Sequence, residues 1–113
     1  MYYQSKDKNF CLYQGNSIQV LGQLKDQVDM IFADPPYFLS NGGKKIQGRS
    51  MVSVNKGDWD KSRGFKGDQE FNREWIKACR DRMSDSATIW ICGTFHNIFS
   101  VANQLTELGF RLL

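Results

Sequence analysis

The sequence lacks the features of an extracellular, zinc-binding or membrane protein. Its three cysteines, Cys11, Cys79 and Cys92, are odd in number, and neither CxxC spacing nor a histidine pair accompanies them. This pattern argues against a disulfide framework or a metal site and predicts three small buried hydrophobic side chains. No apolar run approaches the roughly 20 residues that span a bilayer. The polar N-terminus has no signal-peptide segment, so we expect a cytoplasmic protein without a membrane partner.

Nucleotide-binding and catalytic signatures are also scarce. Gly42 and Gly43 precede two lysines, but the G-x-x-x-x-G-K-[ST] spacing of a P-loop is missing. The only histidine, His96, lies near a predicted strand-to-helix turn, where a local hydrogen-bonding role is more common than catalysis. The only two prolines, Pro35 and Pro36, are adjacent. They stiffen the backbone at one point, where we expect an unusual local structure.

The residues that are present predict one folded domain. Hydrophobic residues make up 41% and aromatic residues 13% of the 113 positions, enough for a core. The net charge of +3 is concentrated between Ser40 and Gly67, where the local charge is +5. The basic residues of this segment are Lys44, Lys45, Arg49, Lys56, Lys61, Arg63 and Lys66. They fit a loop that faces a polyanion, although charge alone fits a solvated loop equally well.

The hydrophobic pattern predicts alternating strands and helices. We expect strands at 10–13, 28–33, 87–92 and 110–113, helices at about 17–24, 68–83 and 95–108, and a long loop at 38–67. Asn16 or Ser17 fits a helix N-cap, and Gly109 fits a C-terminal cap. The run from Val28 to Ala33 is almost continuously apolar, which is typical of a strand covered on both faces.

This order of elements favours an α/β domain with a mainly parallel sheet. In the last helix, we expect five apolar side chains to face the core. They are Ile98, Phe99, Ala102, Leu105 and Leu108. Phe95, one turn before Phe99, is also expected in the core. The final residues FRLL leave an apolar segment after a helix cap, which predicts a fragment of a larger domain.

The stretch MIFADPPY, residues 30–37, ends a predicted central strand with Asp34. Ligands of open α/β sheets bind at the carboxyl ends of the strands, so Asp34 is expected to face a crevice. Pro35 and Pro36 present carbonyl acceptors on a rigid support, and Tyr37 offers a flat face. Two acceptors beside a ring suit an amino group on a planar base, whose lone pair is then directed toward an electrophile. These residues favour alkyl transfer to an aromatic amine over a proline-rich turn.

A second acidic motif, GDWD, lies at residues 57–60. Asp58 and Asp60 are candidate ligands of a cation. The favoured interpretation is a loop turn that Trp59 anchors to the domain.

The stretch DPPY after an apolar strand resembles the catalytic motif of amino-group DNA methyltransferases, in the adenine-N6 branch and the β class. Further stretches resemble the second GATC adenine methylase of DpnII-type restriction systems. They are DPPYFLSNGG, VSVNKGDWDK, EFNREWI, GTFHNIFSV and LGFRLL. The resemblance covers nearly all of residues 10–113. It implies that residues 1–113 are the N-terminal part of one catalytic domain, with a partial Rossmann-like methyltransferase fold and helices on both faces of the sheet.

The same resemblance implies a site-specific DNA adenine-N6 methyltransferase of restriction-modification type, which transfers a methyl group from S-adenosylmethionine to adenine in GATC. The positions that hold the target amine and base match Asp34, Pro35, Pro36 and Tyr37. Asp34 also borders the cofactor in such enzymes. Asn16, where the family commonly has Asp, matches a position near the cofactor adenine.

The resemblance places a DNA-facing loop at about 38–67, in which four basic residues would contact phosphates. They are Lys44, Lys45, Arg49 and Lys56. The expected partner is DNA, either single- or double-stranded. The glycine-rich F-x-G-x-G cofactor loop of the family is absent. We therefore expect weak or no binding of S-adenosylmethionine by this chain alone, and a homodimer or a partner that supplies the C-terminal part.

Two alternatives stay open at this point. One is a non-catalytic fragment that binds DNA or a partner chain, which the missing cofactor loop favours. The other is a related S-adenosylmethionine enzyme that acts on another amide or amine, or a cytosine-N4 methyltransferase. The cytosine-N4 branch commonly begins the motif with Ser, so Asp34 speaks against it.

Overall fold

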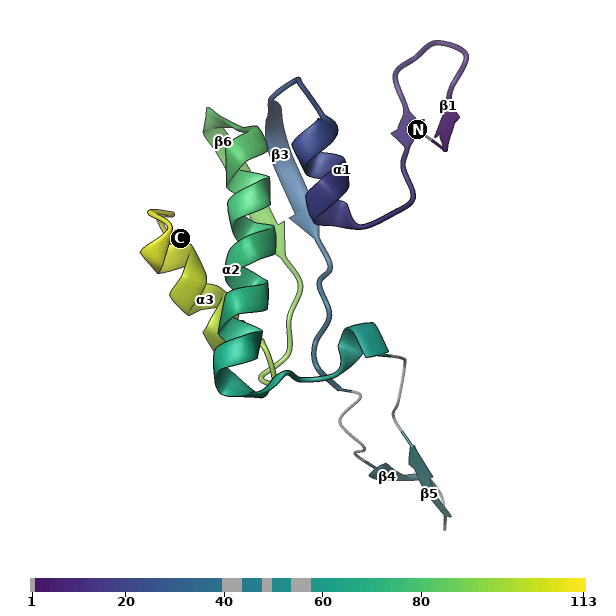
Figure 1. The fold of residues 1–113 in the computed structure, drawn as a ribbon, viewed down its shortest axis with the longest axis vertical. Helices are drawn as coiled ribbons and strands as arrows, with labels where there is room; N and C mark the ends of the chain where they lie inside the picture. The colour runs from purple at the N-terminus through teal and green to yellow at the C-terminus, as the bar shows by residue number, and fades with distance from the viewer. Residues whose placement is uncertain (1, 40–43, 48–49, 54–57) are drawn as a thin grey trace.

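The computed structural model describes residues 2–39, 44–47, 50–53 and 58–113, with backbone only in the two short segments. Three pairs of strands form among these residues. β1 (Tyr3–Gln4) and β2 (Cys11–Leu12) make an N-terminal antiparallel hairpin that stands apart from the helices in Figure 1. β4 (Lys44–Gln47) and β5 (Ser50–Ser53) make a second antiparallel pair. The third pair, β3 and β6, is parallel and positions the site.

The parallel pair confirms the two strands that the apolar runs predict. β3 spans Val28–Ala33, as expected, and β6 spans Met83–Ile91, four residues longer at its start than expected. Their register aligns Ala33 with Ile91, so both strands reach the same edge of the sheet. The backbone N–H of Cys92 donates to the Ala33 carbonyl at 2.9 Å, which ties the two carboxyl ends together. The segments that follow both strands therefore leave from one edge.

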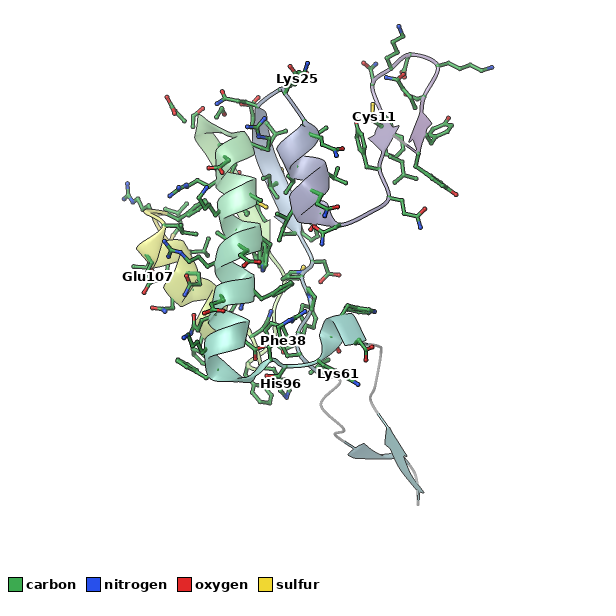
Figure 2. The ribbon with its side chains drawn as sticks, in the orientation of Figure 1. Cys11, Lys25, Phe38, Lys61, His96 and Glu107 are labelled. Carbon is green, nitrogen blue, oxygen red and sulfur yellow. The ribbon has the colours of Figure 1, made fainter. Side chains whose placement is uncertain are left out.

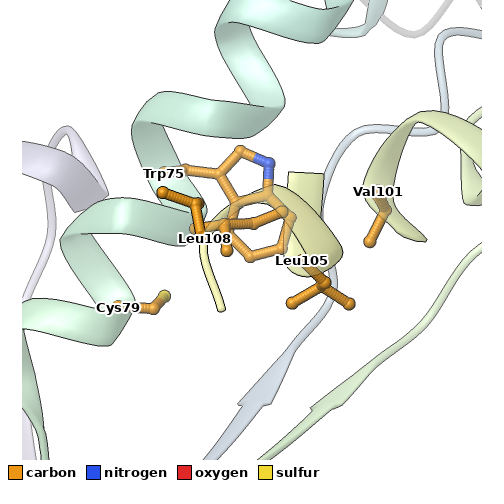
Figure 3. Close-up of a cluster of buried hydrophobic side chains, with 6 residues drawn as sticks. Trp75, Cys79, Val101, Leu105 and Leu108 are labelled. Atoms are coloured by element: carbon orange, nitrogen blue, oxygen red, sulfur yellow. The ribbon is translucent and has the colours of Figure 1, made fainter. Parts of the chain in front are cut away.

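Three helices pack against one face of this pair: α1 (Ser17–Gln23), α2 (Gly64–Arg82) and α3 (Ile98–Glu107). The core cluster consists of Trp75, Ile76, Cys79, Val101, Leu105 and Leu108, five of which are labelled in Figure 3. Ile31, Ala33, Ile89 and Ile91 of the strands and Ile18 and Leu21 of α1 pack against it. In each strand every second side chain therefore faces the helices, as expected for the alternation of side chains along a strand.

The opposite face of the parallel pair is exposed. Met30, Phe32 and Trp90 keep 57%, 68% and 61% of their surface accessible. We expected β3 to be covered on both faces, but the described residues cover only one of them. Phe99 is also 76% exposed and Phe95 75%, so their expected core positions are wrong, and Val101 takes the buried place on α3 instead.

The segment 38–67 is not one long loop. It contains β4, β5, the 3₁₀ turn η1 (Asp58–Asp60) and the start of α2. The expected helix start at Asp68 is wrong, because α2 begins at Gly64. The Asp68 carboxylate reaches back to accept from the Ser62 hydroxyl at 2.5 Å and the Arg63 N–H at 2.7 Å. It thus stabilises the start of a helix that already includes it.

The C-terminal residues confirm one expectation and not another. Gly109 has φ +86° and its N–H donates to the Thr106 carbonyl, while the Phe110 N–H donates to the Leu105 carbonyl, the predicted glycine cap. The expected strand at 110–113 does not form in the described chain. Of the cysteines, Cys79 is buried and Cys11 is exposed, so burial of all three is wrong. Within the described ranges, no helix combines the length and apolarity needed to cross a membrane.

Candidate active site

The motif Asp34–Tyr37 lies directly beyond the end of β3, at the carboxyl edge of the parallel pair. Asp34 is exposed there. The Tyr37 hydroxyl donates a hydrogen bond to Asp34 Oδ1. This hydrogen bond, followed by burial and by the charge of Asp34, raises the pKa of Tyr37 to about 12. The carboxylate and the ring are thus a coupled pair at the place where ligands of parallel sheets bind.

Asp60 holds the backbone that follows the prolines. Its side chain is 1% exposed. Oδ1 accepts from the backbone N–H groups of Tyr37 and Phe38, both at 3.1 Å, and Oδ2 accepts from that of Leu39 at 3.2 Å. Trp59 is 57% exposed, so its expected anchoring role is wrong. The acid beside it anchors the turn instead, because a buried carboxylate needs such donors.

Asn97 holds the motif from the other side. It is 1% exposed and lies just before α3. Its Nδ2 donates to the Pro36 carbonyl at 3.4 Å, and its Oδ1 accepts from the Thr94 N–H at 2.9 Å. The Pro36 carbonyl, one of the two expected ligand acceptors, thus already accepts one hydrogen bond from the protein.

Phe38 joins the motif to the helices. It is 3% exposed and its ring meets Phe71 of α2 edge-on, with centroids 6.0 Å apart. Its φ of +61° lies in the left-handed region, which a bulky residue adopts at a cost of about 1–3 kcal/mol. Figure 2 shows Phe38, Lys61 and His96 at the same end of the molecule, with Lys25 at the opposite end. The strained residue thus lies where the strands end.

Asn16, the other predicted cofactor contact, is the N-cap of α1. Its Oδ1 accepts from the N–H groups of Ile18 and Gln19 at 3.1 and 3.2 Å, which confirms the predicted cap. The His96 ring stacks on Phe95 with centroids 4.1 Å apart, and its Nδ1 lies 3.2 Å from Thr94 Oγ1. The expected local role of His96 agrees with these contacts.

The predicted DNA-binding side chains of Lys44, Lys45, Arg49 and Lys56 lie outside the described residues. Three basic residues of the same segment have described side chains: Lys61, Arg63 and Lys66. Lys61 forms an ion pair with Asp58 at 3.0 Å, and the Arg63 guanidinium lies 4.5 Å from the centre of the Phe71 ring. Basic groups therefore adjoin the motif through η1 and the start of α2.

Sequence reasoning missed two polar side chains that shape this site. The sequence marks Asp60 only as a candidate cation ligand within a loop turn, and no pattern in it singles out Asn97. Burial is the signal that distinguishes them, since both are 1% exposed and surrounded by backbone groups. Asp60 and Asn97 bind backbone groups that lie 22 and 61 residues away in the chain. The local sequence pattern around each residue does not reveal a partner at such a separation. Chemically, the edge offers a carboxylate and a phenol ring on a fixed backbone, a suitable arrangement for holding a planar amine.

Comparison with known proteins agrees with this picture. A protein family described as DNA methylase matches residues 28–113. The chain is 50% identical over 113 residues to the type II methyltransferase M2.MboI of Moraxella bovis, covering 99% of this chain and 41% of that protein. It is 46% identical over 112 residues to the type II methyltransferase M2.DpnII of Streptococcus pneumoniae, covering 98% of this chain and 41% of that protein. It is also 46% identical over 113 residues to M2.LlaDCHI of Lactococcus lactis subsp. cremoris, again covering 41% of that relative.

Proposed function

The chain belongs to the DNA methylase family, and on that premise we propose that it provides the amine-binding part of a DNA adenine-N6 methyltransferase. The chain spans about two fifths of the length of the relatives that it matches. The observation that supports the proposal is the position of Asp34 and Tyr37 at the carboxyl edge of β3 and β6. The proposed target is adenine in GATC, the site modified by the branch that the sequence resembles.

In this proposal, Asp34 and Pro35 hold the exocyclic amine of a base that has left its stack. Asp34 Oδ2 and the Pro35 carbonyl accept the two amine hydrogens, because both groups are acceptors. Tyr37 supplies a face for the base, and its hydroxyl bond to Oδ1 orients the carboxylate. S-adenosylmethionine, the methyl donor that the family implies, provides a methyl group already activated by its sulfonium. The protein therefore contributes mainly position and orientation.

We propose that this chain contributes only part of the cofactor-binding site. The exposed carboxylate of Asp34 fits a contact with a cationic donor at the sheet edge. Asn16 uses its amide oxygen to cap α1, so any cofactor contact falls to other atoms of the residue or to its backbone. We assign the main cofactor-binding elements to protein beyond the matched two fifths.

The exposed face of the parallel pair supports a larger Rossmann-like domain. Met30, Phe32 and Trp90 form an apolar surface that costs free energy in water. A groove of about 980 Å³, lined in part by Trp90, Ala102 and Leu112, runs beside β6 and α3. Additional strands and helices of the whole protein would bury both features. The basic residues of the segment 38–67 would add DNA affinity that falls with salt.

The test is methyl transfer by a chimera in which this chain replaces the matching 41% of the Moraxella bovis relative. Labelled S-adenosylmethionine is supplied with GATC-containing DNA in single- and double-stranded forms, and with a control lacking GATC. Asp34→Ala is compared with Asp26→Ala, an exposed acid at the opposite end of β3. We expect transfer to GATC adenine by wild type and Asp26→Ala, and its loss in Asp34→Ala.

Three other results would count against the proposal. Transfer unaffected by Asp34→Ala would remove the assigned role of the motif. Modification of cytosine would identify the N4 reaction instead. DNA binding without any transfer would identify a binding fragment.

A further inference from the structure

We propose that Asp60 is a positioning residue for methyl transfer, because its carboxylate fixes the backbone that carries the Tyr37 ring beside Asp34. The inference rests on the proposed function, since a position matters only if the motif acts on a substrate. Asp60 itself is not assigned a contact with substrate. It acts through the backbone of three consecutive residues, Tyr37, Phe38 and Leu39.

The geometry is that of an anion site filled by the protein itself. Successive backbone N–H groups converge on one point when a left-handed residue interrupts them, and such concave arrangements bind anions. Phe38 has φ +61°, and the N–H groups of Tyr37, Phe38 and Leu39 all point to Asp60 at 3.1, 3.1 and 3.2 Å. The carboxylate is 1% exposed, so its bonds are shielded from competing water. The left-handed conformation of Phe38 directs the three N–H groups toward Asp60, and their hydrogen bonds in turn stabilise the buried carboxylate.

The position of Asp60 in the chain gives these bonds a second consequence. Asp60 lies 21 to 23 residues after the amides that it binds. Residues 40–57, which contain the four predicted DNA-contacting side chains, lie between the two partners in sequence. The hydrogen bonds therefore join the two ends of that segment at the motif.

A purely structural role is the alternative, and it makes a different prediction. If Asp60 only stabilises the fold, a variant lowers the folded fraction but leaves the rate per folded molecule unchanged. If Asp60 positions the motif, the rate of the folded protein falls, because a shift of about 1 Å can cost about 100-fold in rate. Stability and rate must therefore be measured on the same samples.

Asp60→Asn is the informative variant because it is isosteric. Its Oδ1 still accepts from Tyr37 and Phe38, but its Nδ2 now places a donor against the Leu39 N–H. Asp60→Ala removes both acceptor oxygens and with them all three hydrogen bonds. Asp58→Asn is the matched control. It makes the same charge change two residues away in η1, at a side chain that is 96% exposed and paired only at the surface with Lys61.

The functional arm measures single-turnover methyl transfer in the chimera described above. We expect Asp60→Asn to lower the rate constant per folded molecule by about 10- to 100-fold, with the S-adenosylmethionine concentration at half-maximal rate close to wild type. Thermal stability should fall as well, because the Leu39 N–H loses its buried acceptor. Asp58→Asn should retain the wild-type rate. Equal rates per folded molecule in wild type and Asp60→Asn would overturn the inference while leaving the proposed function intact.

The structural arm uses this chain and does not depend on catalysis. Amide hydrogen exchange is measured at Tyr37, Phe38 and Leu39 in wild type, Asp60→Asn, Asp60→Ala and Asp58→Asn. We expect faster exchange at Leu39 in Asp60→Asn and at all three amides in Asp60→Ala, with no change in Asp58→Asn. Unchanged exchange in Asp60→Ala would overturn the inference even if the chimera were inactive. An inactive wild-type chimera with the expected exchange pattern would instead count against the proposed function.

Discussion

Replacement of Asn97 by alanine should destabilise the protein by about 1.5–3.5 kcal/mol, because two part-buried hydrogen bonds are lost together. The Thr94 N–H loses the Oδ1 acceptor that it meets at 2.9 Å, and an N–H left without its partner costs about 1–3 kcal/mol. The longer bond, from Nδ2 to the Pro36 carbonyl at 3.4 Å, contributes at the lower end of the range, about 0.5 kcal/mol. Alanine supplies neither group at a position that is 1% exposed.

The assay is urea unfolding of the chain followed by tryptophan fluorescence, with the free energy taken by linear extrapolation. Trp75 is a suitable probe because it is 6% exposed in the native structure. Asn103→Ala is the control, since Asn103 is an exposed residue of α3, and its change should stay within about 0.5 kcal/mol. A free energy for Asn97→Ala that matches Asn103→Ala would refute the view that Asn97 links the start of α3 to the motif.

Three further predictions follow from other contacts. Gly109→Ala should lose about 1 kcal/mol because its φ of +86° disfavours a side chain, whereas Gly22→Ala in α1, with open space around it, should gain about 0.5–1 kcal/mol; equal effects in urea unfolding would contradict the cap. Ile76→Ala should cost about 2–5 kcal/mol by the same measurement, since Ile76 is 0% exposed, and a loss below this range would indicate a looser core. In a spectrophotometric titration, the Tyr37 phenolate should form near pH 12, because the hydrogen bond to Asp34 favours the protonated phenol. Asp34→Asn should move this step toward the ordinary value near 10, Tyr37→Phe should remove it, and a Tyr37 step near 10 in wild type would disprove the pairing.

The hydrophobic pattern of the sequence predicts most of the parallel strand pair and its helices, but not every buried residue. The apolar run from Val28 to Ala33 is enough to place β3, and helical spacing from Phe71 to Cys79 places most of α2. The pattern fails for Phe99, because periodicity identifies an apolar stripe but not which edge of the stripe meets the core. In the structure Val101 meets the core cluster and Phe99 remains exposed. The start of α2 was missed for a local reason, since Asp68 looks like a cap but binds groups that precede the helix.

The amino-acid sequence alone is enough to predict the strand that ends at Asp34, the stiff proline pair and an N-cap at Asn16 or Ser17. These depend on residues close together in the chain, and local sterics and hydrogen bonding decide them. The contacts that hold the motif, in contrast, are visible only in the folded protein. Asp60 and Asn97 reach it from 22 and 61 residues away, to Phe38 and Pro36. Such contacts depend on which buried polar groups folding brings together, and the need to satisfy those groups selects the final arrangement.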